Sequence, residues 1–343
     1  MCTMNDKTER LLSRVSIVIV TYKGDDVLRN CLASLWATCS SAPQILVVDN
    51  SPSEATRQLV AGFSNATYIE SPGNPGFAGG NNIAVPFCER DFILLLNNDT
   101  VVKSSTSITD LVVFMDEHPL CGVVQGSITL PKLRNLAGGC GSFLTPLGFQ
   151  YARGFGVPLT NRGLERPERC FSVMGAFMLF PKSLLEETGG FLFYDHFKSY
   201  YEESDFCHRV WLAGREVWYL PTMPIEHLCG HTSGMFPRSE IMRQYLQNTF
   251  FSLRVNFRFW GRMVVVSALF MTILAHAFVH LFRCDITTFN VDLAVLLGQF
   301  RSGKAVREAR RALKRRVSDW QIFRRVVRIP PLGYFVRALR SNA

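Results

Sequence analysis

The sequence predicts an α/β fold in which helices flank a mostly parallel central sheet. Three short apolar runs, SIVIV, ILVV and FILLL, have the length and continuous hydrophobicity of strands buried on both faces, and they cover residues 16–20, 45–48 and 92–96. Segments of helical period separate the runs, as in βαβ units. The chain becomes polar directly after each run. Because ligands of open α/β sheets bind beyond the carboxyl ends of the strands, we expect a site there.

The first βαβ unit covers residues 16–50. Asp25 or Asp26 caps its helix, and Pro43 ends it. The apolar positions of this helix share one face and are Val27, Leu28, Cys31, Leu32 and Leu35. A crossover of this length predicts that the two strands are parallel, with Asp49 at the end of the second one.

A polar helix is expected over residues 53–63 and a short strand over residues 67–70. The next segment, residues 71–82, reads SPGNPGFAGGNN. Its glycines allow close approach of the backbone to a ligand, and its amides could face an anion or a ribose, although the spacing is neither a P-loop nor GxGxxG. A simple turn remains the alternative interpretation.

The stretch FILLLNNDTVV, residues 92–102, joins a buried strand to a polar end. Its carboxylate, Asp99, would point into the crevice at the edge of the sheet, which makes it the first candidate for a metal or nucleotide contact. The alternative is a turn in which Asn97, Asn98 and Asp99 satisfy their own backbone.

Several segments occur in a characteristic order: SIVIVTYKGDDVLRNCLASL, ILVVDNS, NPGFAGGNN, LLLNNDTVV and, later, MGAFMLFPKSLLEETGGF, YYEESDFCHRVWLAGREVWYLP and IEHLCGHTSG. In this order they resemble the family 2 inverting glycosyltransferases, and most of all their bacterial rhamnosyltransferase-like branch. The resemblance covers about residues 15–235. It implies the GT-A fold, a nucleotide-sugar donor and a divalent metal cofactor, Mg²⁺ or Mn²⁺.

The resemblance places Thr21, Tyr22 and Asp49 beside the donor base. There the Asp49 carboxylate would accept the imide N–H of uracil or thymine, which favours a UDP- or dTDP-sugar. A cap on the following helix is the alternative role of this side chain. The other residues that the resemblance assigns to the donor are Gly79, Gly80, Asn81, Asn97, Gly175 and Ala176, the last two near the diphosphate and the acceptor.

By the same resemblance, Asp99 occupies the last position of a DxD-type metal motif, whose first acidic position is Asn97 here. A single carboxylate implies that the donor diphosphate supplies much of the coordination. His227 matches a downstream histidine that completes the metal site. Cys229 and His231 lie nearby in the sequence, but three ligands without a fourth are weak support for structural zinc.

Glu202, Glu203 and Asp205 place three carboxylates within four residues at the start of a helix. The helix dipole alone would explain them. Crowding, however, raises the pKa of at least one carboxyl, as a general base near neutral pH requires. The family has Glu-Asp here with its second member as the base, so Glu203 is the predicted base and Glu202 the alternative.

The formal charge of +9 resides at the C-terminus. Residues 301–343 contain 13 Lys and Arg against two acidic residues, which leaves residues 1–300 at −2. Such a segment, with aromatic residues among the basic ones, favours an anionic membrane surface, and nucleic acid is not the expected partner.

A 20-residue apolar stretch, residues 263–282, is long enough to span a bilayer. Thr272, His276 and His280 recur every four residues, however, and mark one polar face of an interfacial helix. A single crossing would separate the catalytic domain from the basic tail, whereas both belong on the cytoplasmic side, which favours the interfacial or re-entrant arrangement. A second amphipathic stripe follows at Phe289, Leu293, Leu296, Leu297 and Phe300.

The expected organisation has four parts: an N-terminal tail, a GT-A catalytic domain with a nucleotide-sugar half and an acceptor half, a helical membrane-associating region, and a basic tail. Their ranges are residues 1–14, 15–237 (halves 15–102 and 103–237), 238–300 and 301–343. Ten cysteines without a CxxC pair, and no apolar segment ahead of the first strand, predict a cytoplasmic protein at the inner face of the cell membrane.

Together these features predict a metal-dependent glycosyltransferase that moves a sugar onto a lipid-linked or growing glycan of the bacterial surface, such as lipopolysaccharide O-antigen. Rhamnose from dTDP-rhamnose is the single best donor hypothesis. The alternatives are a non-catalytic membrane- or nucleic-acid-binding protein that keeps the fold, and a nucleotidyltransferase, whose chemistry uses a similar sheet and metal.

Overall fold

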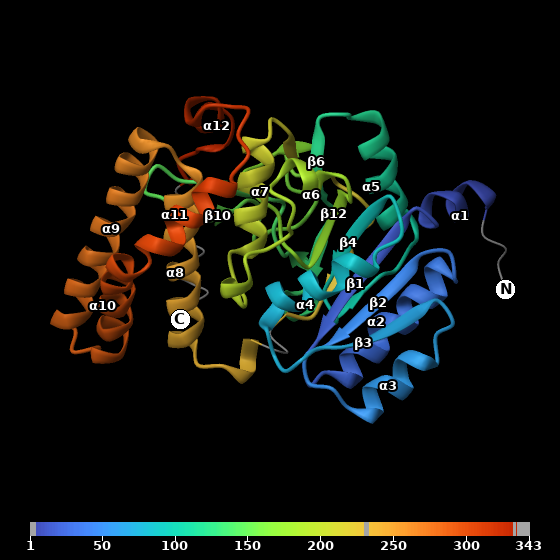
Figure 1. Ribbon diagram of the computed structural model, residues 1–343. Coiled ribbons are helices and arrows are strands. Elements are labelled where there is room, and N and C mark those ends of the chain that lie inside the picture. Colours follow the sequence, from blue (N-terminus) through green and yellow to red (C-terminus); the bar gives the residue numbers. More distant parts are fainter. Residues whose placement is uncertain (1–4, 230–232, 332–333, 335–343) are drawn as a thin grey trace.

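A mixed sheet of eight strands forms the centre of the computed structural model, which describes residues 5–229, 233–331 and 334 (Figure 1). The strand order is β11-β13-β6-β12-β4-β1-β2-β3. These strands are β1 (Val15–Thr21), β2 (Gln44–Asp49), β3 (Ala66–Glu70), β4 (Phe92–Leu96), β6 (Cys121–Gln125), β11 (Glu168–Arg169), β12 (Phe177–Pro181) and β13 (Glu216–Tyr219). Smaller sheets contain β5 (Thr100–Val101), β7 (Ile128–Leu130), β8 (Leu136–Ala137) and β14 (Ile225–His227), and β9 (Ser142–Leu144) with β10 (Gln150–Ala152).

The first four strands are parallel, and β1 lies between β2 and β4. Val20 pairs with Val48 of β2, and Val18 pairs with Leu95 of β4, which confirms the predicted parallel βαβ unit. The chain runs from β1 outward to β3 and then returns across β1 to form β4. The carboxyl ends of β1 and β4 therefore flank the point where the strand order reverses, the place where open α/β sheets bind ligands.

Both faces of the sheet are buried, because successive side chains of each strand enter opposite cores. One core contains the apolar faces of α2 (Asp25–Cys39), α3 (Glu54–Ala61) and α5 (Thr106–Glu117). The other contains residues of α4 (Gly76–Ala84), α6 (Leu184–Glu187), α7 (Glu202–Leu212) and α8 (Arg238–Asn256). The remaining N-terminal helix is α1 (Asp6–Leu12).

The glycine-rich segment, expected as a loop, forms the helix α4 in its second half. Gly80 faces β1 so closely that a Cβ there would lie 2.6 Å from Cγ1 of Val20. Gly79 packs against Pro75 in the same way, at 2.4 Å. The glycines thus serve close packing of a helix on the sheet, and packing overrides their low helix propensity.

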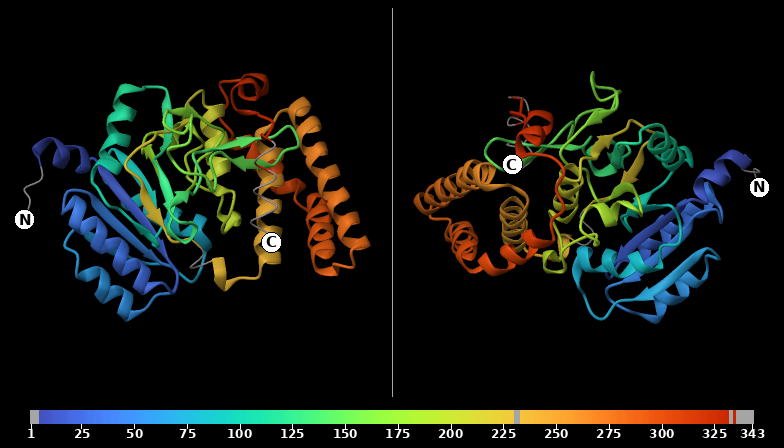
Figure 2. Two further views of the ribbon diagram at one scale, coloured as in Figure 1. Left: turned by 180° about the vertical axis from the view of Figure 1, so that it is seen from behind. Right: turned by 45° about the horizontal axis from the view of Figure 1, so that its top comes forward.

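The C-terminal third forms a helical layer beside the sheet domain (Figures 1 and 2). Outside α8 lie α9 (Phe259–Phe282) and α10 (Ile286–Arg301), followed by α11 (Gly303–Ala312) and α12 (Asp319–Val326). The basic segment folds back onto the domain: Ile322 and Val326 of α12 are buried, and Val327 forms a β-bridge with Leu144. The domain boundary predicted at residue 237 stays a prediction, and α8 contributes Phe250 to the main core.

A buried ion pair fixes α7 against the domain. Arg209 Nε lies 2.9 Å from Asp205 Oδ2, and each side chain is only 1% exposed. Asn256 of α8 donates to the second carboxylate oxygen at 2.8 Å, while the guanidinium also donates to the carbonyls of Thr188 and Phe191. Every polar atom of the carboxylate therefore has a partner in a dry environment.

We expect Arg209→Ala to lower the free energy of unfolding by about 3–5 kcal/mol, because it leaves the Asp205 carboxylate buried without its counter-charge. Denaturant unfolding followed by tryptophan fluorescence measures the change. Arg215→Ala is the matched control, since its partner Glu187 and the guanidinium are both partly exposed and such pairs contribute only about 0–1 kcal/mol. Equal losses in the two variants would contradict this expectation.

Candidate active site

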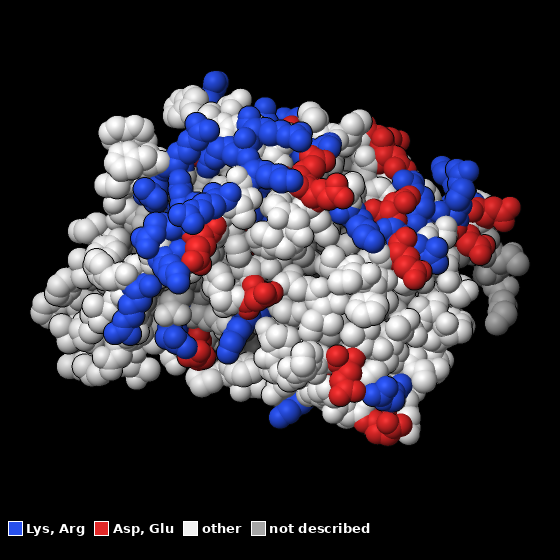
Figure 3. Space-filling model, in the orientation of Figure 1, with Lys and Arg blue, Asp and Glu red and all other residues white. Residues whose placement is uncertain are grey.

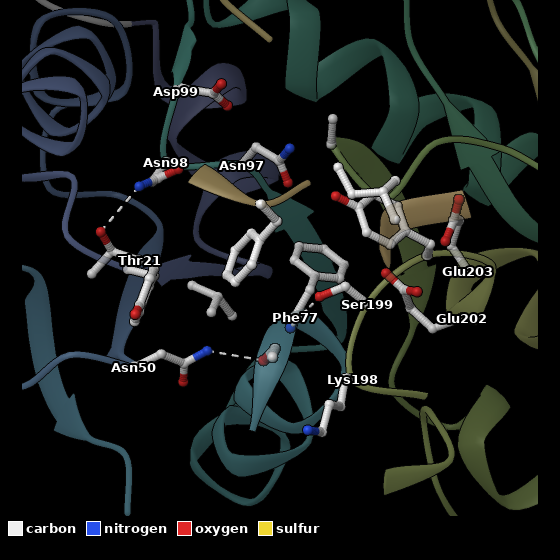
Figure 4. Close-up of a pocket in the computed structure, with 18 of the residues that line it drawn as sticks. Thr21, Asn50, Phe77, Asn97, Asn98, Asp99, Lys198, Ser199, Glu202 and Glu203 are labelled. Carbon is white, nitrogen blue, oxygen red and sulfur yellow. Dashed lines mark hydrogen bonds between the residues drawn. The ribbon is translucent and has the colours of Figure 1, made fainter. Parts of the chain in front are cut away.

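A pocket of about 620 Å³ opens at the carboxyl ends of β1 and β4 and extends to α7 and α8. Figure 4 shows the end of β4, with Asn97 and Asp99, on one side of the pocket, and Glu202 and Glu203 on the other. The helix α4 contributes Phe77 between them. Of the predicted site residues, those that line this pocket are Thr21, Tyr22, Asn97, Asp99, Gly175, Ala176, Glu202, Glu203 and His227.

The strand ends at the nucleotide side are tied together by hydrogen bonds. Asn98 Nδ2 donates to Thr21 Oγ1 at 3.0 Å, and the Asn97 amide donates to the carbonyl of Ala176 at 3.2 Å. The ring of Tyr22 stacks on Phe236, with 6.5 Å between the ring centroids. These contacts give the pocket a preformed wall of an aromatic ring and backbone amides.

Asp49 lies just behind this wall, and the adjacent Asn50 lines the pocket instead. Oδ1 of Asp49 accepts from the Ser51 amide at 2.9 Å, and Oδ2 of Asp49 accepts from the Tyr68 hydroxyl at 3.2 Å. Both carboxylate oxygens therefore already have protein partners, which fix the orientation of the side chain, and Oδ2 has a lone pair left for a further donor.

Gly79, Gly80 and Asn81 are buried on the inner side of α4, and the segment reaches the pocket through Asn74, Gly76 and Phe77 instead. In the structure these three residues pack within the domain and do not line the pocket, and their contact with the donor stays a prediction. The first amides of α4 are also engaged, because Phe77 N donates to Ser199 Oγ at 3.2 Å and Ala78 N donates to the Lys198 carbonyl at 2.7 Å.

Asp99 and His227 form the candidate metal pair. Asp99 Oδ1 lies 3.0 Å from His227 Nε2, and the amide nitrogen of Asn97 lies 3.1 Å from the same imidazole atom. Adjacent ligands about 2.1 Å from one octahedral ion are separated by about 3.0 Å, so the pair has suitable spacing. Across the described ranges no group of three His, Cys, Asp or Glu side chains could hold a metal, so the remaining ligands would come from the donor and water.

The imidazole of His227 is held from both sides. Cys229 Sγ lies 3.1 Å from its Nδ1, opposite the contact with Asp99. Burial by itself lowers the pKa of His227, but the hydrogen bonds to Asp99 and Cys229 outweigh burial and raise the pKa to about 9. Without a cation, the imidazolium neutralises Asp99. His231, the third residue of the HxCxH pattern, lies outside the described residues.

Glu202 and Glu203 begin α7, as the sequence predicts. Burial raises the pKa of Glu203 to about 7, although its side chain keeps partial exposure. Burial and then the neighbouring Glu203 charge raise the pKa of Glu202 well above its usual range, and its Oε2 is buried without a hydrogen-bond partner within the described part of the chain. The pKa of Glu203 thus lies near neutral pH, as a general base requires, whereas burial disfavours the ionised form of Glu202.

Gly175 separates the base from the nucleotide side. A Cβ at this position would lie 3.1 Å from the ring of Phe77 and 3.8 Å from Cβ of Glu203. The position tolerates little more than glycine, because the Phe77 ring occupies the space.

Further residues that line the pocket were given no role from the sequence, among them Phe77, Lys198, Tyr200 and Gln244. Phe77 is part of the glycine-rich segment, so its neighbours gave a signal. Tyr200 opens the segment YYEESDFCHRVWLAGREVWYLP but was given no role, whereas Lys198 and Gln244 lie in segments without a motif, and only the tertiary fold brings these two to the site.

The site lies in a pocket at the switch point of an open α/β sheet, and it contains a carboxylate–histidine pair and a buried carboxyl with a raised pKa. This combination is typical of transferases that act on nucleotide substrates. Residues 16–189 match the model of the family described as "Glycosyl transferase family 2", and the chain belongs to this family. The predicted family and the GT-A fold are thereby confirmed.

Three comparisons illustrate the likeness. The chain is 29% identical over 208 residues to the low-salt glycan biosynthesis hexosyltransferase Agl10 of Haloferax volcanii, covering 59% of this chain and 63% of that protein. It is 26% identical over 252 residues to the rhamnosyltransferase WbbL of Escherichia coli (strain K12), covering 69% of this chain and 91% of that protein. The crystal structure of GalNAc-T7 with UDP, GalNAc and Mn²⁺ superposes with a TM-score of 0.55 at 14% identity, covering 70% of this chain and 47% of that one.

Proposed function

We propose that this protein is an inverting glycosyltransferase that moves a sugar from a nucleoside diphosphate to a hydroxyl of a glycan. The observation that carries the proposal is the placement of the Asp99–His227 pair and the Glu203 carboxyl around a single pocket. Diphosphate departure and acceptor deprotonation need these two kinds of group, and a binding protein needs neither.

In the proposed reaction, Thr21, Tyr22 and the neighbouring Asp49 accommodate the base, and the sugar lies toward Gly175 and Ala176. Glu203 takes the proton of the acceptor hydroxyl while its oxygen attacks the anomeric carbon from the face opposite the leaving group. The bond to the diphosphate breaks, the configuration inverts, and a nucleoside diphosphate is released.

Asp99 and His227 would hold Mg²⁺ or Mn²⁺, and Asn97 lies within reach of the same position. Such an ion supplies positive charge to the departing diphosphate. Lys198 adds a protein cation to the described pocket lining. The Mn²⁺ in the structure named for GalNAc-T7 supports the choice of metal.

Rhamnose from dTDP-rhamnose is the donor we propose, onto a lipid-linked or growing cell-surface glycan. The support is the rhamnosyltransferase name of the E. coli relative and the order of motifs in the sequence. UDP-sugars are the next candidates, since uracil presents the same imide N–H as thymine.

A donor panel with Mn²⁺ tests the proposal on the purified full chain. We expect tight binding of one dTDP- or UDP-sugar by calorimetry, and slow release of nucleoside diphosphate through hydrolysis without an acceptor. Release of pyrophosphate would instead identify a nucleotidyltransferase. Absence of binding and release with every donor would favour the non-catalytic alternative and overturn the proposal.

We also infer that the C-terminal layer attaches the enzyme to the cytoplasmic face of an anionic membrane. One helix, α9, is long and apolar enough to cross a bilayer. Its outward side chains include Trp260, which is 78% exposed, and Phe282, which is 85% exposed. Lys and Arg gather beside its N-terminal end, over α11 and α12 (Figure 3). An apolar helix bordered by basic residues complements an anionic bilayer surface.

The packing of α9 favours a position in the plane of the interface. Val265 and Leu269 pack inward, where the turn at Gly148 touches both, and His276 Nδ1 contacts Asp292 Oδ2 of α10 at 2.7 Å. Of the predicted polar face, His276 thus contacts α10, and His280 contacts Asp285 just before it. A membrane crossing would have to break all of these contacts, whereas surface attachment uses the face already exposed.

Trp260 and Trp320 are the anchors whose loss we expect to weaken membrane attachment. They lie on neighbouring helix starts, because Arg258 N donates to Asp319 Oδ2 at 2.8 Å. The double variant Trp260→Ala/Trp320→Ala should bind anionic vesicles at least about tenfold more weakly, since each buried apolar side chain contributes roughly 1.5–3 kcal/mol. Flotation with phosphatidylglycerol vesicles measures this, with the remote Trp36→Ala as control. Unchanged flotation of the double variant would contradict the inference.

A further inference from the structure

The segment Phe197–Tyr201, here called the strap, leads directly into the catalytic helix α7 and has an unusual backbone. Lys198, Tyr200 and Tyr201 have φ values of 51°, 69° and 74°, in the left-handed region that side chains other than glycine rarely adopt. Such conformations persist only where surrounding contacts impose them. Glu202 and Glu203 follow the last of these residues, so the strap determines where both carboxyls lie.

On its nucleotide side, the strap is bound to the start of α4. The Lys198 carbonyl accepts from Ala78 N at 2.7 Å, and Ser199 Oγ accepts from Phe77 N at 3.2 Å. Gly76 has no room for a side chain, because a Cβ would lie 2.3 Å from the same carbonyl oxygen. Figure 4 shows Phe77, Lys198 and Ser199 between the strand ends and the two glutamates.

On the opposite side, two side chains of α8 hold the strap: Gln244 Nε2 donates to the Phe197 carbonyl at 2.9 Å, and Asn248 makes the larger number of contacts. The side-chain nitrogen of Asn248 lies within hydrogen-bond distance of three carbonyl oxygens, those of Phe197 at 3.0 Å, Ser199 at 3.0 Å and Tyr200 at 2.7 Å, so its two N–H groups are shared among the three. Asn248 is buried, at 5% exposure, and does not line the pocket. Three converging carbonyl oxygens repel one another, and a shared N–H₂ group is what allows them to converge.

We propose that Asn248 is a positioning residue for the transfer reaction: by gathering the three strap carbonyls, it sets the distance of the Glu203 carboxylate from the donor pocket. This inference rests on the proposed function, in which Glu203 is the base. It also means that α8, which packs against α9 and α10, holds the catalytic carboxyl in place from the helical layer. A residue that fixes geometry in this way affects turnover more than donor binding.

The test compares Asn248→Asp with Thr249→Val in the full chain. The first exchange keeps the shape but replaces the N–H₂ donor with an oxygen that faces three carbonyls. The second alters an equally buried neighbour on α8, whose hydroxyl donates to the Tyr245 carbonyl of its own helix. Asn248→Ser, which keeps one donor, carries the comparison if the aspartate variant does not fold.

For Asn248→Asp we expect kcat to fall about 100-fold, because displacing a catalytic group such as the Glu203 carboxylate by about 1 Å lowers the rate by about this factor. The dissociation constant of the donor nucleotide should stay within about threefold, and the midpoint of the pH profile of kcat/KM should move. Deuterium uptake by strap amides should increase. Thr249→Val should leave all four readouts unchanged.

Unchanged strap exchange in Asn248→Asp, or equal losses of kcat and donor affinity, would overturn the proposal. So would an identical loss in Thr249→Val. If the proposed function is wrong, the wild type will transfer no sugar from any donor. Deuterium uptake by the strap amides would still show whether Asn248 holds the strap.

Discussion

Replacing Glu203 with glutamine should lower kcat by about 10²–10⁴-fold, the range that a positioned general base contributes. The amide keeps the shape of the side chain but cannot take the acceptor proton. Donor binding should be nearly unchanged, because Glu203 lies on the far side of the pocket from the strand ends. Steady-state kinetics and calorimetry on the same preparations measure the two effects.

The pH profile gives an independent check of the same residue. Burial raises the pKa of Glu203 to about 7, and the base acts only when it is ionised. The wild-type rate should therefore be constant above this pH and fall about tenfold for each unit below it.

Two variants complete the comparison of carboxyls. Glu202→Gln should retain more activity than Glu203→Gln, because burial and the neighbouring Glu203 charge raise the pKa of Glu202 well above its usual range and so disfavour the ionised form that a base needs. Glu216→Gln, a buried carboxyl of β13 that pairs with Arg169 outside the pocket, should leave the rate unchanged. If Glu202→Gln loses more activity than Glu203→Gln, the two assignments must be exchanged.

The strands and their chemically active ends could be predicted from the sequence because they depend on local patterns. Runs of four or five apolar residues define buried strands, and the parallel crossover places their polar ends at one edge. Asp99 was found this way, directly after a strand, whereas the choice of Glu203 among the carboxyls at a helix start came from the resemblance to the family; both residues line the pocket.

What the sequence did not predict depends on packing and on contacts between distant residues. The helix α4 contains three glycines in nine residues, and it forms because Gly80 fits against Val20. Asn248 lies in a helix without any motif, and its three partners are 48 to 51 residues away in the chain. The basic pattern of residues 301–343 likewise concealed the buried Ile322 of α12.

Replacing Asp99 with asparagine should reduce turnover at least about 10³-fold, since the variant removes the only protein carboxylate proposed for the metal and with it the charge that binds the ion at the diphosphate. The exchange preserves shape, so the fold should persist. Calorimetric titration of Mn²⁺ into the protein with nucleoside diphosphate should show a matching loss of metal affinity. Chelation of the wild type should abolish turnover, and added Mn²⁺ should restore it.

A control variant at Asp110, an exposed carboxylate of α5, tells whether the effect of Asp99→Asn comes from the loss of a metal ligand or from the loss of one negative charge. Asp110→Asn removes the same charge far from the pocket and should keep both activity and Mn²⁺ affinity. In Asp99→Asn the His227 imidazole also loses its partner at 3.0 Å, so its pKa should fall from about 9 toward its usual value, which NMR titration of the imidazole protons detects. Full activity of the wild type in chelator, together with an active Asp99→Asn, would show that the Asp99–His227 pair is structural and that transfer proceeds on the Glu203 side without a metal.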